Sequence, residues 1–335
     1  MFSSPRFVAR RASRVAVASI ASASEERSSS ARGTTTLSVA GAVAVAAVAA
    51  THASGSETAR LVGSIALGSA LALVGYAKRS LDASGAMAAV GVGFGSIYAD
   101  ARFGAALAAF FFTSSAATRI GSEVKMRVDE HYRVGGARNW VQVVANGGVP
   151  TGLALAYAFG TFDAATSGAL ASAYLGYYAC CGGDTWASEL GVLSKAKPRL
   201  ITDWSREVDA GTNGGVTLVG WLASASGGAA VGVAFHIAQV LLRAFAPNGT
   251  VRFAQSDATM LIVFGAVAGV FGSLIDSVLG ATIQYSGWCS ERQKVVSKPG
   301  PTVTRISGLE ILSNSAVNFV SGVITALACA LVFPL

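Results

Sequence analysis

The sequence predicts an all-α, polytopic integral membrane protein, a bundle of about nine spanning helices with the N-terminus inside. The chain of 335 residues is 52% hydrophobic and only 13% charged, whereas soluble domains carry about 25% charged residues. Its apolar residues gather in runs that approach the ~20 residues of one span. Its basic residues fall almost entirely on one side of the alternation that these runs define.

The first 33 residues are expected to form a separate segment. They carry six arginines and several serines, with no acidic residue before Glu25. This pattern is typical of an organellar transit peptide, and a disordered basic tail fits it equally well. Residues 34–335 are expected to form a single multi-span membrane domain. The membrane is predicted to be the chloroplast envelope or an endomembrane.

The spans themselves are predicted from nine apolar runs, most of them long enough to cross a bilayer once. The runs lie at residues 34–52, 59–77, 83–99, 102–118, 143–160, 164–183, 214–242, 258–284 and 313–334. The two runs at 214–242 and 258–284 exceed one span, which indicates a tilt, a kink or a re-entrant piece.

The distribution of Lys and Arg over the loops tests this arrangement of spans. With the N-terminus inside, 21 of the 25 Lys and Arg residues lie on the inside. The other side receives only Arg60, Arg102, Arg243 and Arg252. This is the positive-inside pattern of membrane proteins. It accounts for the net charge of +7 without a nucleic-acid partner, and we expect none.

The four cysteines exclude a disulfide framework. Cys180 and Cys181 are adjacent, no CxxC pair occurs, and the three histidines are far apart in the sequence. The sequence therefore predicts no zinc site. The adjacent cysteines are expected to be small packing residues at the end of an apolar run.

The stretch GGDTWASE, residues 182–189, places two carboxylates beside an apolar run. On a helix, Asp184 and Ser188 share a face, as do Thr185 and Glu189. Hard oxygen ligands of this kind suit Mg²⁺, which takes one or two protein carboxylates and fills its other positions with water and phosphate. The alternative is structural: Asp184 caps a short interfacial helix and Trp186 anchors it at the headgroups.

Two inside loops could bind phosphate. The first carries Lys195, Lys197 and Arg199, which could hold phosphate oxygens or only supply positive-inside charge. The second could form an anion-binding nest of backbone N–H groups or only a flexible turn. It contains Gly211, Thr212, Asn213, Gly214 and Gly215.

Further polar residues interrupt the apolar runs on the same side. Asp276 lies within a run, where an acid indicates a functional site by default, although a pore or a helix-to-helix hydrogen bond would also explain it. The remaining set predicts a shared polar cavity, while single amides are usually contacts between helices. It consists of Arg138, Asn139, Gln142, Asn146, Ser188, Gln284, Asn314 and Asn318.

Six of these segments together resemble one family. GGARNWVQV, GDTWASELG, LSKAKPRLIT, GTNGGVT, GSLIDSVLGAT and NSAVN are similar in order and spacing to the transmembrane protein 19 family, also called domain-of-unknown-function family 92. The likeness runs from about residue 60 to the C-terminus. Asp184, Glu189, Gly211, Thr212 and Gly214 fall on motifs shared with the chloroplast phytyl-phosphate kinases of this family. The kinase branch carries an acid at the position of Asn213. In this respect the chain resembles the transmembrane protein 19 branch more closely.

The resemblance implies a membrane kinase that uses Mg²⁺ and a nucleoside triphosphate to phosphorylate a prenyl monophosphate such as phytyl phosphate. The implied metal ligands and catalytic acids are Asp184, Glu189 and Asp276. The basic and glycine-rich loops would hold phosphates, and the apolar spans would seat the prenyl tail. Two other classes stay open: a transporter or channel lined by Asp276 and the asparagines, and a noncatalytic membrane protein.

Overall fold

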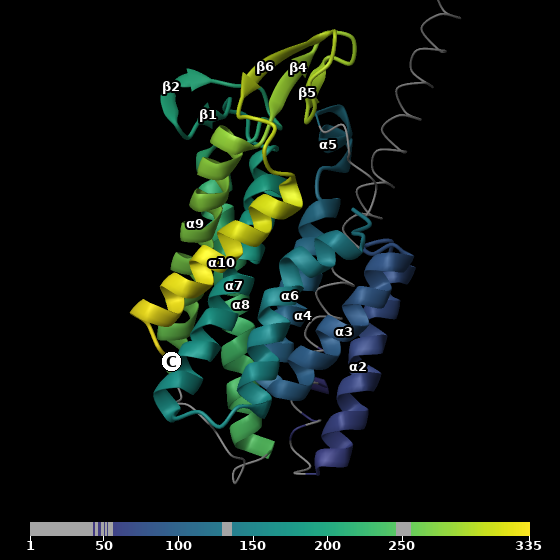
Figure 1. Ribbon diagram of the computed structural model, residues 1–335, viewed down its shortest axis with the longest axis vertical. Helices are drawn as coiled ribbons and strands as arrows, with labels where there is room; N and C mark the ends of the chain where they lie inside the picture. Colours follow the sequence, from purple (N-terminus) through teal and green to yellow (C-terminus); the bar gives the residue numbers. More distant parts are fainter. Residues whose placement is uncertain are drawn as a thin grey trace, which may run out of the picture.

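The computed structural model describes residues 56–128, 136–245 and 256–335, with a few isolated positions between 43 and 52. Long helices run side by side, and two small sheets lie together at one end (Figure 1). The predicted segment 1–33 lies outside the described residues, as does most of the predicted first span at 34–52.

The helices of the described ranges follow the predicted apolar runs closely. They are α2 Glu57–Ala77, α3 Ala83–Ala99, α4 Ala101–Arg119, α5 Ser122–Val128, α6 Trp140–Phe159, α7 Ala164–Gly191, α8 Leu218–Phe245, α9 Ala258–Ile283 and α10 Asn314–Val332. Seven of them begin at a side chain that accepts a backbone N–H of the first turn, which fixes where the helix starts. These caps are Ser56, Asp82, Asp100, Asn139, Asp163, Asp257 and Ser313.

By length and composition, four of the described helices could cross a membrane: α2, α8, α9 and α10. The pair α4 and α5, bent by 78°, would add a fifth if it forms one span. The helical bundle is therefore confirmed, while the number of nine spans and the inside N-terminus stay predictions.

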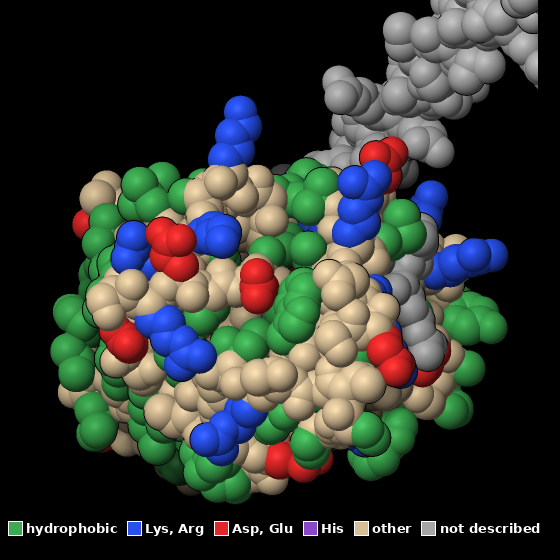
Figure 2. Space-filling view, turned by 90° about the horizontal axis from the view of Figure 1, so that it is seen from above, with side chains coloured by type: hydrophobic (Ala, Val, Ile, Leu, Met, Phe, Trp, Pro, Cys, Tyr) green, Lys and Arg blue, Asp and Glu red, His purple; other side chains and the backbone are tan. Residues whose placement is uncertain are grey.

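Two antiparallel sheets, absent from the sequence-based prediction, interrupt the loops at one end of the bundle. The first has the strand order β2-β1-β3 and the second β5-β4-β6. The strands are β1 Arg199–Leu200, β2 Asp203–Glu207, β3 Gly215–Val216, β4 Ser286–Cys289, β5 Lys294–Val296 and β6 Val303–Ser307. Figure 2 looks onto this end and shows basic and acidic side chains spread over it.

Helix α7 forms the centre of the bundle and is buried without interruption from Ala171 to Gly183. Tyr174 stacks on Phe103 of α4 with 4.2 Å between the ring centroids, and aromatic stacking of this kind adds to the gain from burial. Cys180 and Cys181 are buried free thiols in this core, which confirms the packing role expected from the sequence.

A close crossing of α7 and α9 sets the geometry of the sheet end. A Cβ atom at Gly183 would lie 2.7 Å from the Cα of Gly269, so only glycine allows the two backbones to touch. Asp184 directly follows this contact on α7, and Asp276 lies two turns after it on α9. The crossing therefore brings two acids of distant sequence to one place.

Candidate functional site

A polar cavity of ≈ 1050 Å³ opens at the sheet end of the bundle. Its walls come from helices α4 to α10 and the loops that carry the sheets. It brings together most of the residues that the sequence singles out. Those lining it are Arg138, Gln142, Asn146, Asp184, Ser188, Glu189, Gly211, Thr212, Asn213, Gly214, Gly215, Asp276, Gln284, Asn314 and Asn318.

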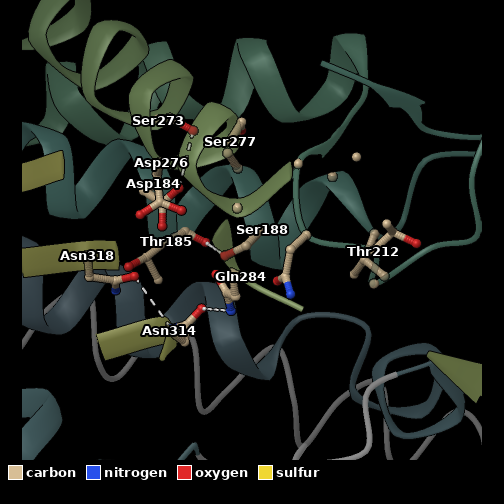
Figure 3. Close-up of a pocket in the computed structure, with 18 of the residues that line it drawn as sticks. Asp184, Thr185, Ser188, Thr212, Ser273, Asp276, Ser277, Gln284, Asn314 and Asn318 are labelled. Atoms are coloured by element: carbon tan, nitrogen blue, oxygen red, sulfur yellow. Dashed lines mark hydrogen bonds between the residues drawn. The ribbon is translucent and has the colours of Figure 1, made fainter. Parts of the chain in front are cut away.

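Asp184 and Asp276 form the acidic centre of the cavity. Ser273 donates to Asp184 Oδ1 over 3.4 Å, and Ser321 of α10 donates to Asp276 Oδ2 over 3.1 Å. Figure 3 shows the two carboxylates in the same region of the cavity, and they interact electrostatically. Asp184 lies inside the continuous helix α7, so the alternative that it caps a short interfacial helix is wrong.

No basic side chain neutralises this pair within the described residues. The ion pairs found there join Arg102 to Asp100, Lys125 to Glu189 and Arg199 to Glu207. Two neighbouring carboxylates that are partly removed from water repel each other and lose hydration, so such a pair is stabilised by a cation or a proton. Their oxygens, with the hydroxyls of Ser273 and Ser321 nearby, are of the hard type that Mg²⁺ prefers.

A row of carboxamides lies next to the acidic centre. Gln284, at the end of α9, donates to Asn314 Oδ1 over 3.3 Å, and Asn314 donates to Asn318 Oδ1 over 3.4 Å. Figure 3 shows this row beside Asp184 and Asp276. The bond from Gln284 joins the end of α9 to α10, as predicted for an amide between helices, whereas the bond from Asn314 to Asn318 lies within α10; all three side chains also line the cavity.

Glu189 does not join the acidic centre, contrary to the expected set of three metal-binding carboxylates. Its side chain pairs with Lys125 Nζ at 2.7 Å and accepts a hydrogen bond of 2.7 Å from Thr118. Among the described residues, no group of three or more His, Cys, Asp and Glu side chains could hold a metal ion. A metal at this site would therefore rest on Asp184 and Asp276 alone among the predicted ligands.

Lys125 lines the cavity, although no sequence motif singled it out. The bend of 78° between α4 and α5 turns its ammonium group back toward the bundle, where it also donates to the Ala117 carbonyl over 2.8 Å. Lys298, after β5, is another cation of the lining that the motifs did not indicate.

The three basic residues expected to hold phosphate lie outside the cavity. Lys195, Lys197 and Arg199 are exposed and do not belong to its lining. Arg199 instead pairs with Glu207 at 3.2 Å across the first sheet. The turn after α7 leads the chain away from the acidic centre, so closeness in sequence does not become closeness in space.

The glycine-rich loop lines the cavity, but most of its backbone N–H groups donate hydrogen bonds within the protein. The N–H of Thr212 donates to the Asp209 carbonyl, that of Asn213 to Ser286 Oγ, and that of Gly215 to the Thr212 carbonyl. These three groups are therefore not available to an anion. Gly214 has a φ of +74°, and a Cβ atom there would collide with α9. The loop thus packs against the helix that carries Asp276.

The segment before α6 divides into a structural and a cavity-lining part. Asn139 caps α6 in a reciprocal capping box with Gln142 and does not line the cavity. Arg138 does, and its guanidinium donates to Ser115 Oγ over 3.3 Å. Burial lowers the pKa of Arg138, and Glu189 opposes the shift. Arginine stays charged under such conditions, so Arg138 supplies a fixed cation to the wall.

Comparison with known proteins identifies relatives in plants and archaea. The family model of integral membrane protein DUF92 matches residues 66–326. Protein PGR of Arabidopsis thaliana is 46% identical over 267 residues, covering 77% of this chain and 91% of that protein. The uncharacterized membrane protein MJ0933 of Methanocaldococcus jannaschii is 31% identical over 220 residues, covering 65% of this chain and 80% of the archaeal one. No solved structure is significantly similar. The chain therefore belongs to the DUF92 family of integral membrane proteins.

Proposed function

We propose that this membrane protein is a Mg²⁺- and nucleotide-dependent kinase that phosphorylates a prenyl monophosphate at the polar cavity. The observation that carries the proposal is the acidic centre: Asp184 and Asp276 are partly buried and lack a basic partner among the described side chains. A bound divalent cation would remove the repulsion between them and bring phosphate oxygens with it.

The chemistry of the lining is compatible with phosphoryl transfer. An oxygen of the prenyl monophosphate attacks the γ-phosphorus of the nucleotide, the bridging P–O bond to the β-phosphate breaks, and a prenyl diphosphate and a nucleoside diphosphate leave. Mg²⁺ neutralises charge on the phosphates during such transfers. Asp184 and Asp276 would hold it, while Arg138 and Lys298 would attract and orient the anionic groups.

The position of the site favours an enzyme over a transporter. The cavity lies at the end that carries the sheets, and below it α7 is buried continuously from Gly183 back to Ala171. The aromatic cluster around Tyr174 and Phe103 fills this part of the bundle. Transport sites generally lie near mid-depth between structural repeats, whereas a kinase needs access from one aqueous side only.

Turnover by the purified protein tests the proposal. The full chain in detergent, given Mg²⁺ and CTP, UTP or ATP together with phytyl or farnesyl phosphate, should yield the diphosphate. Asp184→Asn should abolish the product while the protein stays folded. Asp209→Asn is the matched control, because Asp209 is exposed at the same end but does not line the cavity. A folded sample without product from any pairing would overturn the proposal.

A further inference from the structure

A narrow apolar crevice adjoins the polar cavity. Its volume is ≈ 60 Å³, and it shares three lining residues with the cavity of ≈ 1050 Å³: Arg138, Gln142 and Asn146. One space is thus apolar, the other is polar and holds the acidic centre, and a cation with two amides stands between them. Such an arrangement is complementary to an amphiphile with an anionic head.

The wall of the crevice is almost entirely hydrocarbon. Besides the three shared residues, it is formed by Leu71, Ala72, Leu81, Ala89, Val92, Gly93, Leu107, Phe110, Phe111, Val143, Gly147 and Tyr178. Leu71, Ala89 and Phe111 are only half-buried, so the crevice reaches the outer surface of the helices. Leu73 of α2 and Met87 of α3 are 66% and 72% exposed on that surface, as expected of residues that face lipid.

The size of the crevice limits what enters. A cavity of about 150 Å³ holds one benzene molecule, so ≈ 60 Å³ accepts a short length of one thin chain. Two acyl chains side by side do not fit. The remainder of a longer chain would leave between the helices into the bilayer, where its burial needs no protein wall.

The polar rim leads from the crevice to the acidic centre. Asn146 Oδ1 lies 3.8 Å from Cys181 Sγ, and Asp184 follows Cys181 by three residues on α7. Side chains three apart are neighbours on a helix face. A head group held by Arg138 and Asn146 would therefore lie about one helical turn from Asp184. Phosphoryl transfer requires such closeness between the phosphate and the proposed metal-binding carboxylate.

We propose that the crevice binds the first carbons of a single hydrocarbon chain, with Arg138 and Asn146 on the phosphate that the chain carries. This assignment rests on the proposed kinase function and adds the place and the selectivity of its lipid substrate. It distinguishes a single-chain phosphate such as an isoprenyl phosphate from a two-chain phospholipid such as phosphatidic acid.

Binding measured without turnover tests the crevice independently of catalysis. The full chain in detergent would be titrated with farnesyl phosphate, with phosphatidic acid and with methyl phosphate, in the presence of a farnesyl phosphate photoprobe that carries a diazirine near its first isoprene unit. We expect the label on the crevice wall, at Leu107, Phe110 or Val143. Farnesyl phosphate should compete with the probe, and phosphatidic acid should not.

Two matched substitutions on α3 sharpen the test. Ala89→Phe fills the crevice, whereas Ala88→Phe adds the same bulk at a half-buried neighbour outside both linings. Ala89→Phe should weaken the binding of farnesyl phosphate at least ~10-fold, since the loss of apolar contacts in a pocket lowers affinity by about 10–200-fold. Ala88→Phe should leave it unchanged, and methyl phosphate should bind all three proteins alike.

The outcomes separate the two proposals. Labelling of the crevice without turnover would leave the lipid site standing and overturn the kinase. The lipid-binding role of the crevice alone would be overturned if Ala89→Phe left the turnover of farnesyl phosphate unchanged. A label spread over the outer helix faces would have the same meaning. Competition by phosphatidic acid equal to that of farnesyl phosphate would refute the single-chain selectivity.

Discussion

Two carboxylate centres, one buried and one partly buried, divide the bundle into contrasting ends. Away from the sheets, Asp100 receives two hydrogen bonds from the Arg102 guanidinium, at 2.9 and 2.7 Å, and Arg102 is only 2% exposed. At the sheet end, Asp184 and Asp276 face a cavity and have hydroxyl partners but no cation among the described side chains. The first centre is electrostatically complete, and the second is not.

The difference teaches how to separate structural from functional charge inside a membrane protein. Removing charge from water is costly, and a local counter-charge offsets that cost. Asp100 and Arg102 supply both charges within three residues at the turn between α3 and α4, so this centre needs nothing from solution. The acidic centre draws its two charges from different helices and remains unbalanced, which is the state expected of a ligand site.

The largest expected effect comes from breaking the complete centre. Arg102→Leu leaves Asp100 buried without its cation, so we expect a loss of about 3–5 kcal/mol in the free energy of unfolding. Thermal unfolding in detergent measures it. Adding Asp100→Asn to the same chain should recover much of the loss. If Arg102→Leu unfolds at the wild-type temperature, the pair does not stabilise this end.

The acidic centre should respond in the opposite way. Asp184→Asn or Asp276→Asn removes one of two repelling charges, so the variants without metal should be as stable as the wild type or more so. Mg²⁺ at 100 times its dissociation constant should stabilise the wild type by about 2.7 kcal/mol, and EDTA should reverse this. Both variants should lose the shift. An Mg²⁺ shift that persists in both would place the cation elsewhere.

An intermediate effect is expected for Lys125 and Glu189, whose side chains are 3% and 21% exposed. Lys125→Met leaves the half-buried carboxylate of Glu189 without its cation and should lower the free energy of unfolding by about 1–3 kcal/mol. Glu189→Gln keeps an acceptor for Thr118 and should cost less. A double-mutant cycle measured by thermal unfolding gives the coupling between the two residues. Strict additivity of the two single losses would contradict the ion pair.

The smallest effect belongs to Arg199 and Glu207, whose side chains are 46% and 51% exposed. Arg199→Gln should change stability by about 0.2–1 kcal/mol, because solvent and salt screen an exposed pair. Its effect should fall further as ionic strength rises, while that of Arg102→Leu should not. Loss of turnover in Arg199→Gln would restore the phosphate-binding role that the position of Arg199 argues against.

The helices were predictable because burial and span length act locally. The apolar runs at 83–99 and 258–284 match the bounds of α3 and α9 to within a residue. Asp82 and Asp257, which cap the N-termini of these two helices, are visible in the sequence. The sheets escaped prediction because β1 and β3 have only two residues each and the longest strands, β2 and β6, only five. Strands that short carry no periodicity of their own.

The site was predictable as a set of polar residues on one end, but not as a geometry. Asp276 stood out because an acid in an apolar run is rare, and it does line the cavity beside Asp184. The pairing of Glu189 with Lys125 depends on the bend between α4 and α5. Gly121, with a φ of +67°, stands at that bend, but a single glycine does not specify the angle between the two helices. Lys195 and Lys197 failed as cavity residues for the same reason, since a turn decides which way they face.

The contact of Gly183 with Gly269 has a consequence for ion selectivity. Two backbones already in contact cannot approach further, so the main chain limits how closely α7 and α9 can bring the positions of Asp184 and Asp276 together. If the acidic centre holds a divalent cation as proposed, this close crossing favours a small ion such as Mg²⁺. An added methyl group at either position would widen the gap and favour cations of larger radius, such as Ca²⁺, over Mg²⁺.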